Sequence, residues 1–369
     1  MYYRCRIGKR LQGKSQARLL LLSLLIAAAA LAACSSTKSS ASAARSKHIP
    51  TKLQPVTIGT FTAGAPQVEI QIMETEGIFA KYGLKPVIIS ATSGPSLVAG
   101  QLSGSIDIGS GQIGLILPAL IQGHDFKFVS PVAMPNFYNV IAQPSIPVKP
   151  AGIGLTPNAK ANIRAMRGAT VGVAAVGGLN YLTMAALAKA SGLGPTEFTQ
   201  VASGGPATLV AGFKTHRFQY LVTDHPVFTL LKEAGVPFHT VAMVNTSTKN
   251  DWGHMVSNDW MATSAFVRSH TSVAMKFCRA MLAATSYIGN PKHKAQVIAA
   301  GEKVEGISPA EGAMWYRNNR FLYSPGIPMT KPVWDAQREW LVASPYANSP
   351  FPHYSTINYK PCSALGRAT

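Results

Sequence analysis

Short apolar runs typical of β-strands are each followed in this sequence by a Gly- or Ser-rich turn and then by a helical pattern. The unit recurs at residues 55–81, 84–102, 106–122 and 169–191. Strands that alternate with helices in this way are typical of an α/β fold with mostly parallel strands. The turns fall where strands end and helices begin, and open α/β sheets bind ligands there because free backbone N–H groups point outward.

An export signal is predicted at residues 1–33. Six Lys or Arg residues and no acid precede a mostly apolar run at residues 19–33, which ends in Leu31-Ala32-Ala33-Cys34. This run is too short to span a bilayer comfortably. The pattern predicts a bacterial lipoprotein that is cut before Cys34, lipidated on that thiol and held outside the cytoplasm on a membrane surface. An ordinary signal followed by an incidental cysteine is the alternative.

Two lobes of ordinary domain size are expected behind a disordered tether. Residues 34–54 are rich in Ser, Ala, Thr and Lys and offer almost nothing to bury. No second transmembrane run follows. The remaining chain of about 315 residues is long enough for two lobes with cores of their own.

The chain is strongly basic, with a formal net charge of +19 that falls to +13 if the six cations of the signal are removed. An export signal and scattered Lys and Arg residues argue against a nucleic-acid partner. Attraction to an anionic membrane or to an anionic solute fits better, and adaptation of the whole surface to an acidic milieu fits equally well.

Cys278 and Cys362 are the two cysteines that remain beyond the signal and the lipid site. In an oxidising exterior these two residues could form a disulfide, but the sequence alone leaves their pairing open.

Seven segments carry a resemblance to a known family. They read VTIG at 56–59, EGIFAKYGL at 76–84, SGP at 93–95, LVAGQLSGSIDIG at 97–109, MRGATVGV at 166–173, ATLVAGF at 207–213 and TDHP at 223–226. In this order and spacing the chain resembles the substrate-binding proteins of ABC importers, in the branch that takes up alkanesulfonates, taurine, nitrate and thiamine-pyrimidine precursors.

The resemblance implies a two-lobed fold of the periplasmic-binding-protein type (type II), with the ligand cleft between the lobes. Residues 55–143 and 258–369 would form lobe I, and residues 144–257 would form lobe II. The lobes would close on a small solute, and the protein would deliver that solute to the transmembrane permease subunits of the importer. We expect a monomer with no cofactor and no metal.

Strand ends that open helices place the expected ligand contacts in this cleft. Hydroxyls, amides and N–H groups can hold an oxyanion there, and an aromatic ring can cover an apolar tail or stack on a ring. The candidate residues are Phe61, Gly64, Ser93, Gly94, Ser110, Gly111, Gln112, Asn136, Tyr138, Gly177, Gly178, Asn180 and Asp224.

Several functions are compatible with these residues. The basic surplus and the hydroxyl-lined turns favour an anion such as a sulfonate or nitrate, whereas the aromatic residues and Gln112 would also suit a pyrimidine or another heteroaromatic compound. A sensor lipoprotein without transport would keep the same two lobes. Catalysis is not expected, because the sequence has no HExxH, G-x-S-x-G or Walker motif and no Cys/His cluster at metal-binding spacing.

Overall fold

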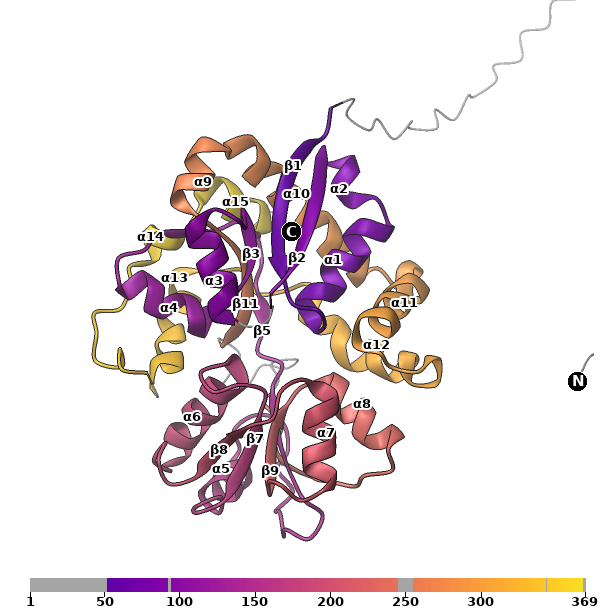
Figure 1. Ribbon diagram of the computed structural model, residues 1–369, viewed down its shortest axis with the longest axis vertical. Coiled ribbons are helices and arrows are strands. Elements are labelled where there is room, and N and C mark those ends of the chain that lie inside the picture. Colours follow the sequence, from indigo (N-terminus) through magenta and orange to yellow (C-terminus); the bar gives the residue numbers. More distant parts are fainter. Residues whose placement is uncertain (1–51, 92–93, 245–254, 343, 368–369) are drawn as a thin grey trace, which may run out of the picture. The chain divides into compact units, whose positions relative to one another are not determined.

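A computed structural model describes residues 52–367, except 92–93, 245–254 and 343. Cys34, Ser93 and most of the predicted tether therefore lie outside the described residues. The described chain forms two β-sheets, each flanked by helices (Figure 1). No helix in this part is both long enough and apolar enough to cross a membrane.

The first sheet has the strand order β2-β1-β3-β11-β4, and β5 pairs with β11 beside this path. In β1, Val56 and Ile58 are buried in the core beneath the sheet. The strands are β1 (Gln54–Thr60), β2 (Leu84–Ser90), β3 (Ile108–Gln112), β4 (Phe126–Phe128), β5 (Met134–Pro135) and β11 (Val256–Thr263). Together with its helices, this sheet makes up the first lobe.

Helices of the first lobe come from both ends of the described chain. In α10, buried residues such as Val273, Phe277, Met281 and Ile288 recur at helical spacing and pack into the core. The amino-terminal helices are α1 (Ala65–Thr75), α2 (Ile78–Lys81), α3 (Gly94–Ser103) and α4 (Ile113–Ile121). The carboxyl-terminal ones are α9 (Ser264–Ser269), α10 (Thr271–Gly289), η1 (Pro291–His293), α11 (Lys294–Glu305), α12 (Pro309–Tyr323), α13 (Lys331–Ala336), η2 (Gln337–Leu341), α14 (Tyr354–Ile357), α15 (Lys360–Ser363) and η3 (Leu365–Arg367).

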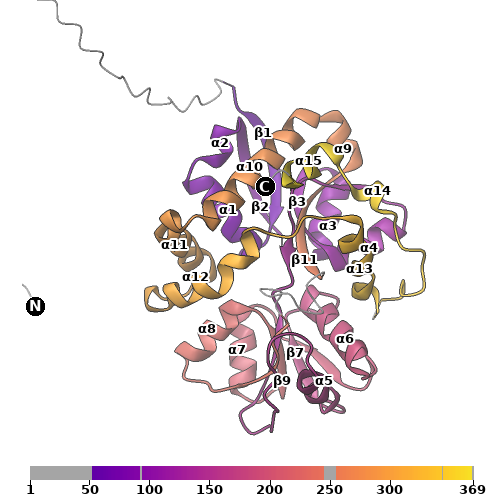
Figure 2. The ribbon, with the colours of Figure 1, turned by 180° about the vertical axis from the view of Figure 1, so that it is seen from behind.

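The second sheet has the order β10-β6-β9-β7-β8. Helices flank this sheet and complete the second lobe (Figure 2). Its strands are β6 (Asn139–Ala142), β7 (Thr170–Val173), β8 (Thr199–Ala202), β9 (Tyr220–Thr223) and β10 (His239–Ala242). The helices are α5 (Pro157–Arg164), α6 (Leu179–Ser191), α7 (Pro206–Lys214) and α8 (His225–Glu233).

Both sheets are mixed, but all strands other than β11 in the first sheet and β6 in the second run in one direction, so most strands are oriented in parallel, as expected. β1 pairs in parallel with β2 and β3, and β7 pairs in parallel with β8 and β9. However, β11 runs antiparallel to β3, β4 and β5, and β6 runs antiparallel to β9 and β10. The antiparallel pairs arise because β6 and β11 follow the segments that carry the chain from one sheet to the other.

The chain changes sheets earlier than the resemblance implied. β5 belongs to the first sheet and β6 to the second, so the outward crossing lies between Pro135 and Asn139 rather than after residue 143. The return lies between β10 and β11, before Val256. Residues 136–138 are consequently part of the junction between the lobes.

One apolar core continues from the first lobe into the second. It contains Ile113 and Leu117 of α4, Leu182 of α6, and Trp340 of η2. A Cβ atom added at Gly114 would lie 2.6 Å from Leu182 Cδ1 and 3.4 Å from Trp340 Cβ, so glycine allows these three elements to approach closely. The carboxyl-terminal segment thus packs against both lobes along this edge.

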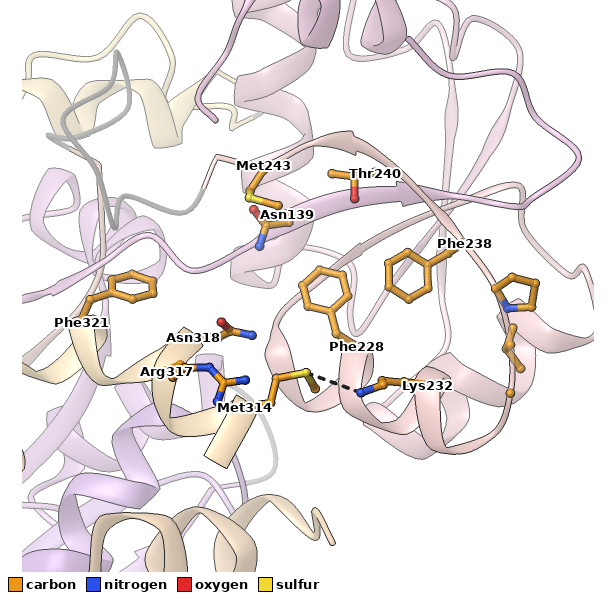
Figure 3. Close-up of a pocket in the computed structure, with 13 residues that line it drawn as sticks. Asn139, Phe228, Lys232, Phe238, Thr240, Met243, Met314, Arg317, Asn318 and Phe321 are labelled. Carbon is orange, nitrogen blue, oxygen red and sulfur yellow. Dashed lines mark hydrogen bonds between the residues drawn. The ribbon is translucent and has the colours of Figure 1, made fainter. Parts of the chain in front are cut away.

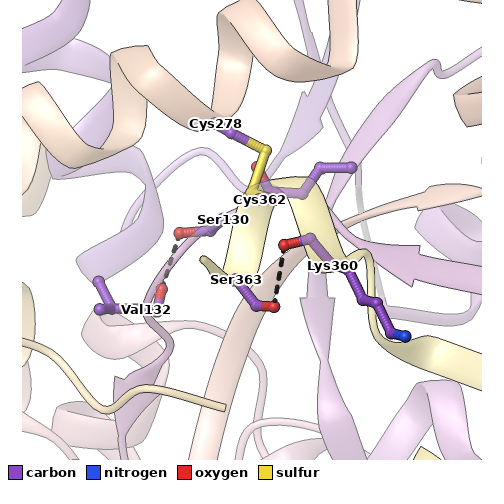
Figure 4. Close-up of a disulfide and its surroundings, with 7 residues drawn as sticks. Ser130, Val132, Cys278, Lys360, Cys362 and Ser363 are labelled. Atoms are coloured by element: carbon purple, nitrogen blue, oxygen red, sulfur yellow. Dashed lines mark hydrogen bonds between the residues drawn. A yellow bond between two sulfur atoms is a disulfide. The ribbon is translucent and has the colours of Figure 1, made fainter. Parts of the chain in front are cut away.

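A disulfide joins Cys278 of α10 to Cys362 of α15, with 5.7 Å between their Cα atoms (Figure 4). Both residues are buried. The bond ties the end of the described chain to the longest helix of the first lobe, and it resolves the pairing that the sequence left open.

Candidate functional site

A cavity of about 250 Å³ lies where the strand ends of the two lobes face each other. We call it the cleft. Both lobes and the junction contribute to its wall, as expected for a ligand site between two α/β sheets. The residues that line it are Phe61, Thr62, Ala63, Gly64, Ala65, Pro66, Gln112, Phe137, Tyr138, Ala174, Leu179, Asn180, Gly205, Pro206, Leu209, Val222, Thr223, Asp224, Pro226, Val227 and Asn258.

The first lobe supplies the turn between β1 and α1. Gly64 has a φ of 96°, a left-handed value that glycine adopts without strain, and it forms the N-cap of α1. The turn brings Phe61 to the cleft directly after the strand ends.

The second lobe supplies the amino-terminal ends of three helices. Gly178, Gly205 and Asp224 are the N-caps of α6, α7 and α8, and none of them makes a side-chain capping hydrogen bond. Helix amino termini carry partial positive charge and free N–H groups. Pro206 and Pro226, at the starts of α7 and α8, remove one such donor from each helix.

Aromatic rings cover one part of the cleft. Phe137 and Tyr138 lie in the junction with ring centroids 4.7 Å apart and planes inclined by 40°. Phe61 of the first lobe lines the same cavity. Such rings favour a flat or apolar group on the ligand.

Two buried polar atoms of the cleft have no hydrogen-bond partner among the described residues. They are Asn258 Nδ2, a donor, and Thr223 Oγ1, which can donate or accept. Ser110 donates to Asn258 Oδ1 at 2.7 Å, and this bond fixes the orientation of the amide. Buried polar groups are usually hydrogen-bonded, so these two atoms lack a partner that such groups normally have.

Asp224 is the only charged side chain among the described residues that line the cleft. Burial raises the pKa of its carboxyl to about 6, and its own backbone N–H acts in the opposite direction. The Asp224 carboxylate is therefore ionised at neutral pH. Burial and the nearby charge of Asp224 also raise the pKa of the Tyr138 phenol.

Further carboxyl groups in the first lobe are buried or partly buried. Glu69 of α1 accepts a hydrogen bond from Trp260 Nε1 at 2.8 Å, and Glu305 of α11 accepts one from Trp315 Nε1 at 2.6 Å. Burial raises the pKa of each glutamate to about 8, and the charge of Asp224 adds to the shift at Glu305. Burial and the charge of Glu69 hold the pKa of Asp259 well above its usual value. The described residues contain no group of three or more His, Cys, Asp or Glu side chains that could hold a metal ion.

The structure brings about half of the predicted site residues together. Phe61, Gly64, Gln112, Tyr138, Asn180 and Asp224 line the cleft. Gly94, Ser110, Gly111, Asn136, Gly177 and Gly178 are not among its lining residues, and Ser93 lies outside the described residues. The binding role of each residue stays a prediction.

Ser110 and Gly111 belong to a strand rather than to the turn predicted for them. They pair with Trp260 and Asp259 of β11. A Cβ atom at Gly111 would lie 2.5 Å from Met261 Sδ, so the small residue lets β11 pack closely. Ser110 acts on the cleft through Asn258 rather than by lining it.

The other residues outside the cleft have local structural roles. Gly94 begins α3, and a Cβ there would overlap Leu115 Cδ1. Asn136 is buried, and its Oδ1 accepts a hydrogen bond from the Tyr138 N–H at 3.4 Å, which helps to hold the junction. Gly177 has a φ of 73° in the turn before α6, and Gly178 caps that helix.

Gly205, Pro206 and Asn258 were missing from the predicted site. The first two could have been found, because GGPATLVAG at 204–212 closely repeats SGPSLVAG at 93–100, a turn that was selected. Asn258 had no comparable signal, since it reaches the cleft from the middle of β11 through pairing with Gln112.

Neither the family models nor the curated proteins include a match to this sequence. Solved structures do match. The periplasmic aliphatic sulphonate-binding protein SsuA from Escherichia coli shares 16% identity over 81% of this chain and 95% of its own, with a TM-score of 0.62. The fold is that of the periplasmic binding proteins.

Two further structures agree with this fold. The periplasmic nitrate-binding protein NrtA from Synechocystis PCC 6803 shares 14% identity over 86% of this chain and 89% of its own, with a TM-score of 0.60. The Candida albicans CA3427 gene product, described as having the generic periplasmic binding protein fold, shares 12% identity over 72% of this chain and 80% of its own, with a TM-score of 0.53. The two-lobed α/β fold predicted from the sequence is thus confirmed.

Proposed function

We propose that this protein is the extracytoplasmic solute-binding component of an ABC importer. Support comes from the periplasmic-binding-protein fold, from the predicted export signal, and from a cleft built by both lobes. In this role the lobes close on a small solute, and the closed form delivers that solute to the permease subunits. Lipidation at Cys34 would hold the protein at the membrane that contains the permease.

The solute that fits the cleft best is a small, flat organic compound with an amine, amidine or ring N–H group. The observation that carries this choice is the Asp224 carboxylate, the only charge among the described lining residues. A carboxylate accepts hydrogen bonds and attracts cations, and Phe61, Phe137 and Tyr138 provide apolar and π surface beside it. A volume of about 250 Å³ limits the solute to roughly one substituted ring.

This choice favours the heteroaromatic alternative over the anion that the sequence suggested. An anion in the cleft would lie near an ionised carboxylate, and no Lys or Arg among the described lining residues would offset the repulsion. The excess of Lys and Arg residues that makes the chain basic is therefore not found among the described residues that line the cleft.

A thermal-shift screen of the purified protein tests the proposal. The screen compares amine-bearing pyrimidines and related heteroaromatic compounds with sulfonates and nitrate, because a ligand that binds the folded state raises the melting temperature. We expect the best hit in the first group. Calorimetry with that hit should show at least about thirtyfold weaker binding to Asp224→Asn, as expected when one partner of a buried charged contact is removed.

The matched control is Asp335→Asn, which removes an exposed carboxylate that pairs with Lys331 on the surface. It should bind the hit as the unmodified protein does. Selective binding of sulfonates or nitrate, with Asp224→Asn equal or tighter, would overturn the choice of solute. A protein that binds neither group would count against the importer role itself.

A further inference from the structure

A second and larger cavity, of about 740 Å³, lies between the α8–β10 region of the second lobe and α12 of the first (Figure 3). Figures 1 and 2 both show α8 beside α12. None of the residues that line this cavity also lines the cleft. The cavity falls within the volume range of known small-molecule sites, whereas voids in well-packed interiors are seldom larger than a water molecule.

Aromatic rings form much of its wall. Phe228 of α8 and Phe238, which precedes β10, stack with centroids 5.6 Å apart and planes inclined by 28°. Phe321 of α12 faces them across the cavity (Figure 3), and Met243 and Met314 add flexible apolar surface. All three phenylalanines are only partly buried, so a ligand ring could cover apolar surface that now faces solvent.

Two cations lie at this cavity, and they differ in their contacts. Lys232 pairs with Glu311 at 3.2 Å and contacts Met314 Sδ at 3.7 Å, so its charge is offset. Arg317 is exposed and has no ion pair with any described residue. Its guanidinium can form a paired hydrogen bond with a carboxylate or sulfonate.

We propose that this cavity is a second ligand site, which takes a small aromatic organic anion. The ring of the ligand lies against Phe228 and Phe238, and its acidic group meets Arg317. The ligand charge expected here is opposite to that expected for the cleft, because the one charged side chain among the described residues that line the cleft is the Asp224 carboxylate. Because α8 and α12 belong to different lobes, an occupant contacts both lobes and couples this site to the closure of the cleft.

Calorimetric titration of the purified full chain with naphthalenesulfonate tests the site. We expect one molecule bound per chain. Arg317→Ala should weaken binding about two- to fivefold, as for the loss of an exposed ion pair, and Phe238→Ala about tenfold, as for the loss of an aromatic contact. The matched control is Arg320→Ala, an exposed cation on the same helix that does not line the cavity, and it should bind as the unmodified protein does.

A Phe61→Ala variant distinguishes this cavity from the cleft. If Phe61→Ala abolishes naphthalenesulfonate binding while Arg317→Ala and Arg320→Ala bind equally well, the anion binds in the cleft and the second site is overturned. Absence of binding to the unmodified chain also overturns it. Arg317→Ala changes only an exposed side chain, so the test remains decisive even if Phe238→Ala fails to fold.

Discussion

Lower pH should stabilise this protein, because Glu69 is buried and holds its proton more tightly in the folded state than in the unfolded state. Its pKa is about 8 in the fold and 4.5 in the unfolded reference. Between these values the folded protein binds a proton that the unfolded chain has released. The contribution of Glu69 to stability is therefore most favourable below about pH 4.5, falls as pH rises through this window, and levels off above about pH 8.

The size of the effect follows from this window. One group that is protonated only in the folded state changes the free energy of unfolding by about 1.4 kcal/mol per pH unit. Between pH 5 and pH 7, Glu69 alone then contributes a loss of about 2 to 3 kcal/mol, an upper bound for one group. Glu305 and Asp259 act in the same direction, because their pKa values are also raised.

Urea unfolding of the unmodified protein and of Glu69→Gln at pH 5, 6 and 7 measures this contribution. The glutamine side chain would keep an oxygen that accepts the hydrogen bond from Trp260 Nε1, but it cannot titrate. The loss of stability between pH 5 and pH 7 should therefore be smaller in the variant by about 2 kcal/mol. The control, Glu339→Gln, changes an exposed carboxyl on η2 and should keep the unmodified profile. Parallel profiles for Glu69→Gln and the unmodified protein would refute the reasoning.

Four further outcomes are expected. Affinity for a cationic solute should fall about tenfold per pH unit below pH 6, where Asp224 becomes protonated, and calorimetry that shows tighter binding in acid would contradict this. Replacing both Cys278 and Cys362 with serine should cost about 2 to 5 kcal/mol in urea unfolding, because the disulfide closes a loop with a sequence separation of 84 residues; unchanged stability would argue against that role. Cys34→Ser should release the protein from the membrane fraction or leave it uncleaved, whereas unchanged fractionation together with an unlipidated amino terminus by mass spectrometry would exclude lipidation. Small-angle scattering should show a smaller radius of gyration with saturating solute, and an identical profile with binding confirmed would count against closure.

Local sequence patterns predicted the parts of the fold that depend on neighbouring residues. The run before Phe61 is a strand, and the turn at Gly64 opens a helix, as expected. Ser110 and Gly111 were expected in a turn because small residues usually mark one. They are instead part of β3, because β11 pairs with them from about 150 positions away in the sequence.

The same physical reason limits prediction of the candidate site. Phe61 lies at the end of a strand that the sequence predicts, and Asp224 lies in a segment that carries the family resemblance, so the place of both residues in the cleft could be anticipated. Asn258 reaches the cleft from β11 through its pairing with Gln112, and its position depends on a strand that is distant in the sequence. The local hydrophobic periodicity of the sequence does not predict contacts between segments that lie far apart in the chain.

The two edges of the contact between the lobes are built from different chemistry. Along the edge formed by α4, α6 and η2, Leu182 and Trp340 share one dry, continuous core. Along the opposite edge, α8 and α12 meet through Lys232 and Glu311. Separating the first edge would expose a large apolar area, whereas the second exchanges its polar contact for water at little cost. If the lobes open, we therefore expect the edge formed by α4, α6 and η2 to stay packed and the Lys232–Glu311 ion pair to separate first.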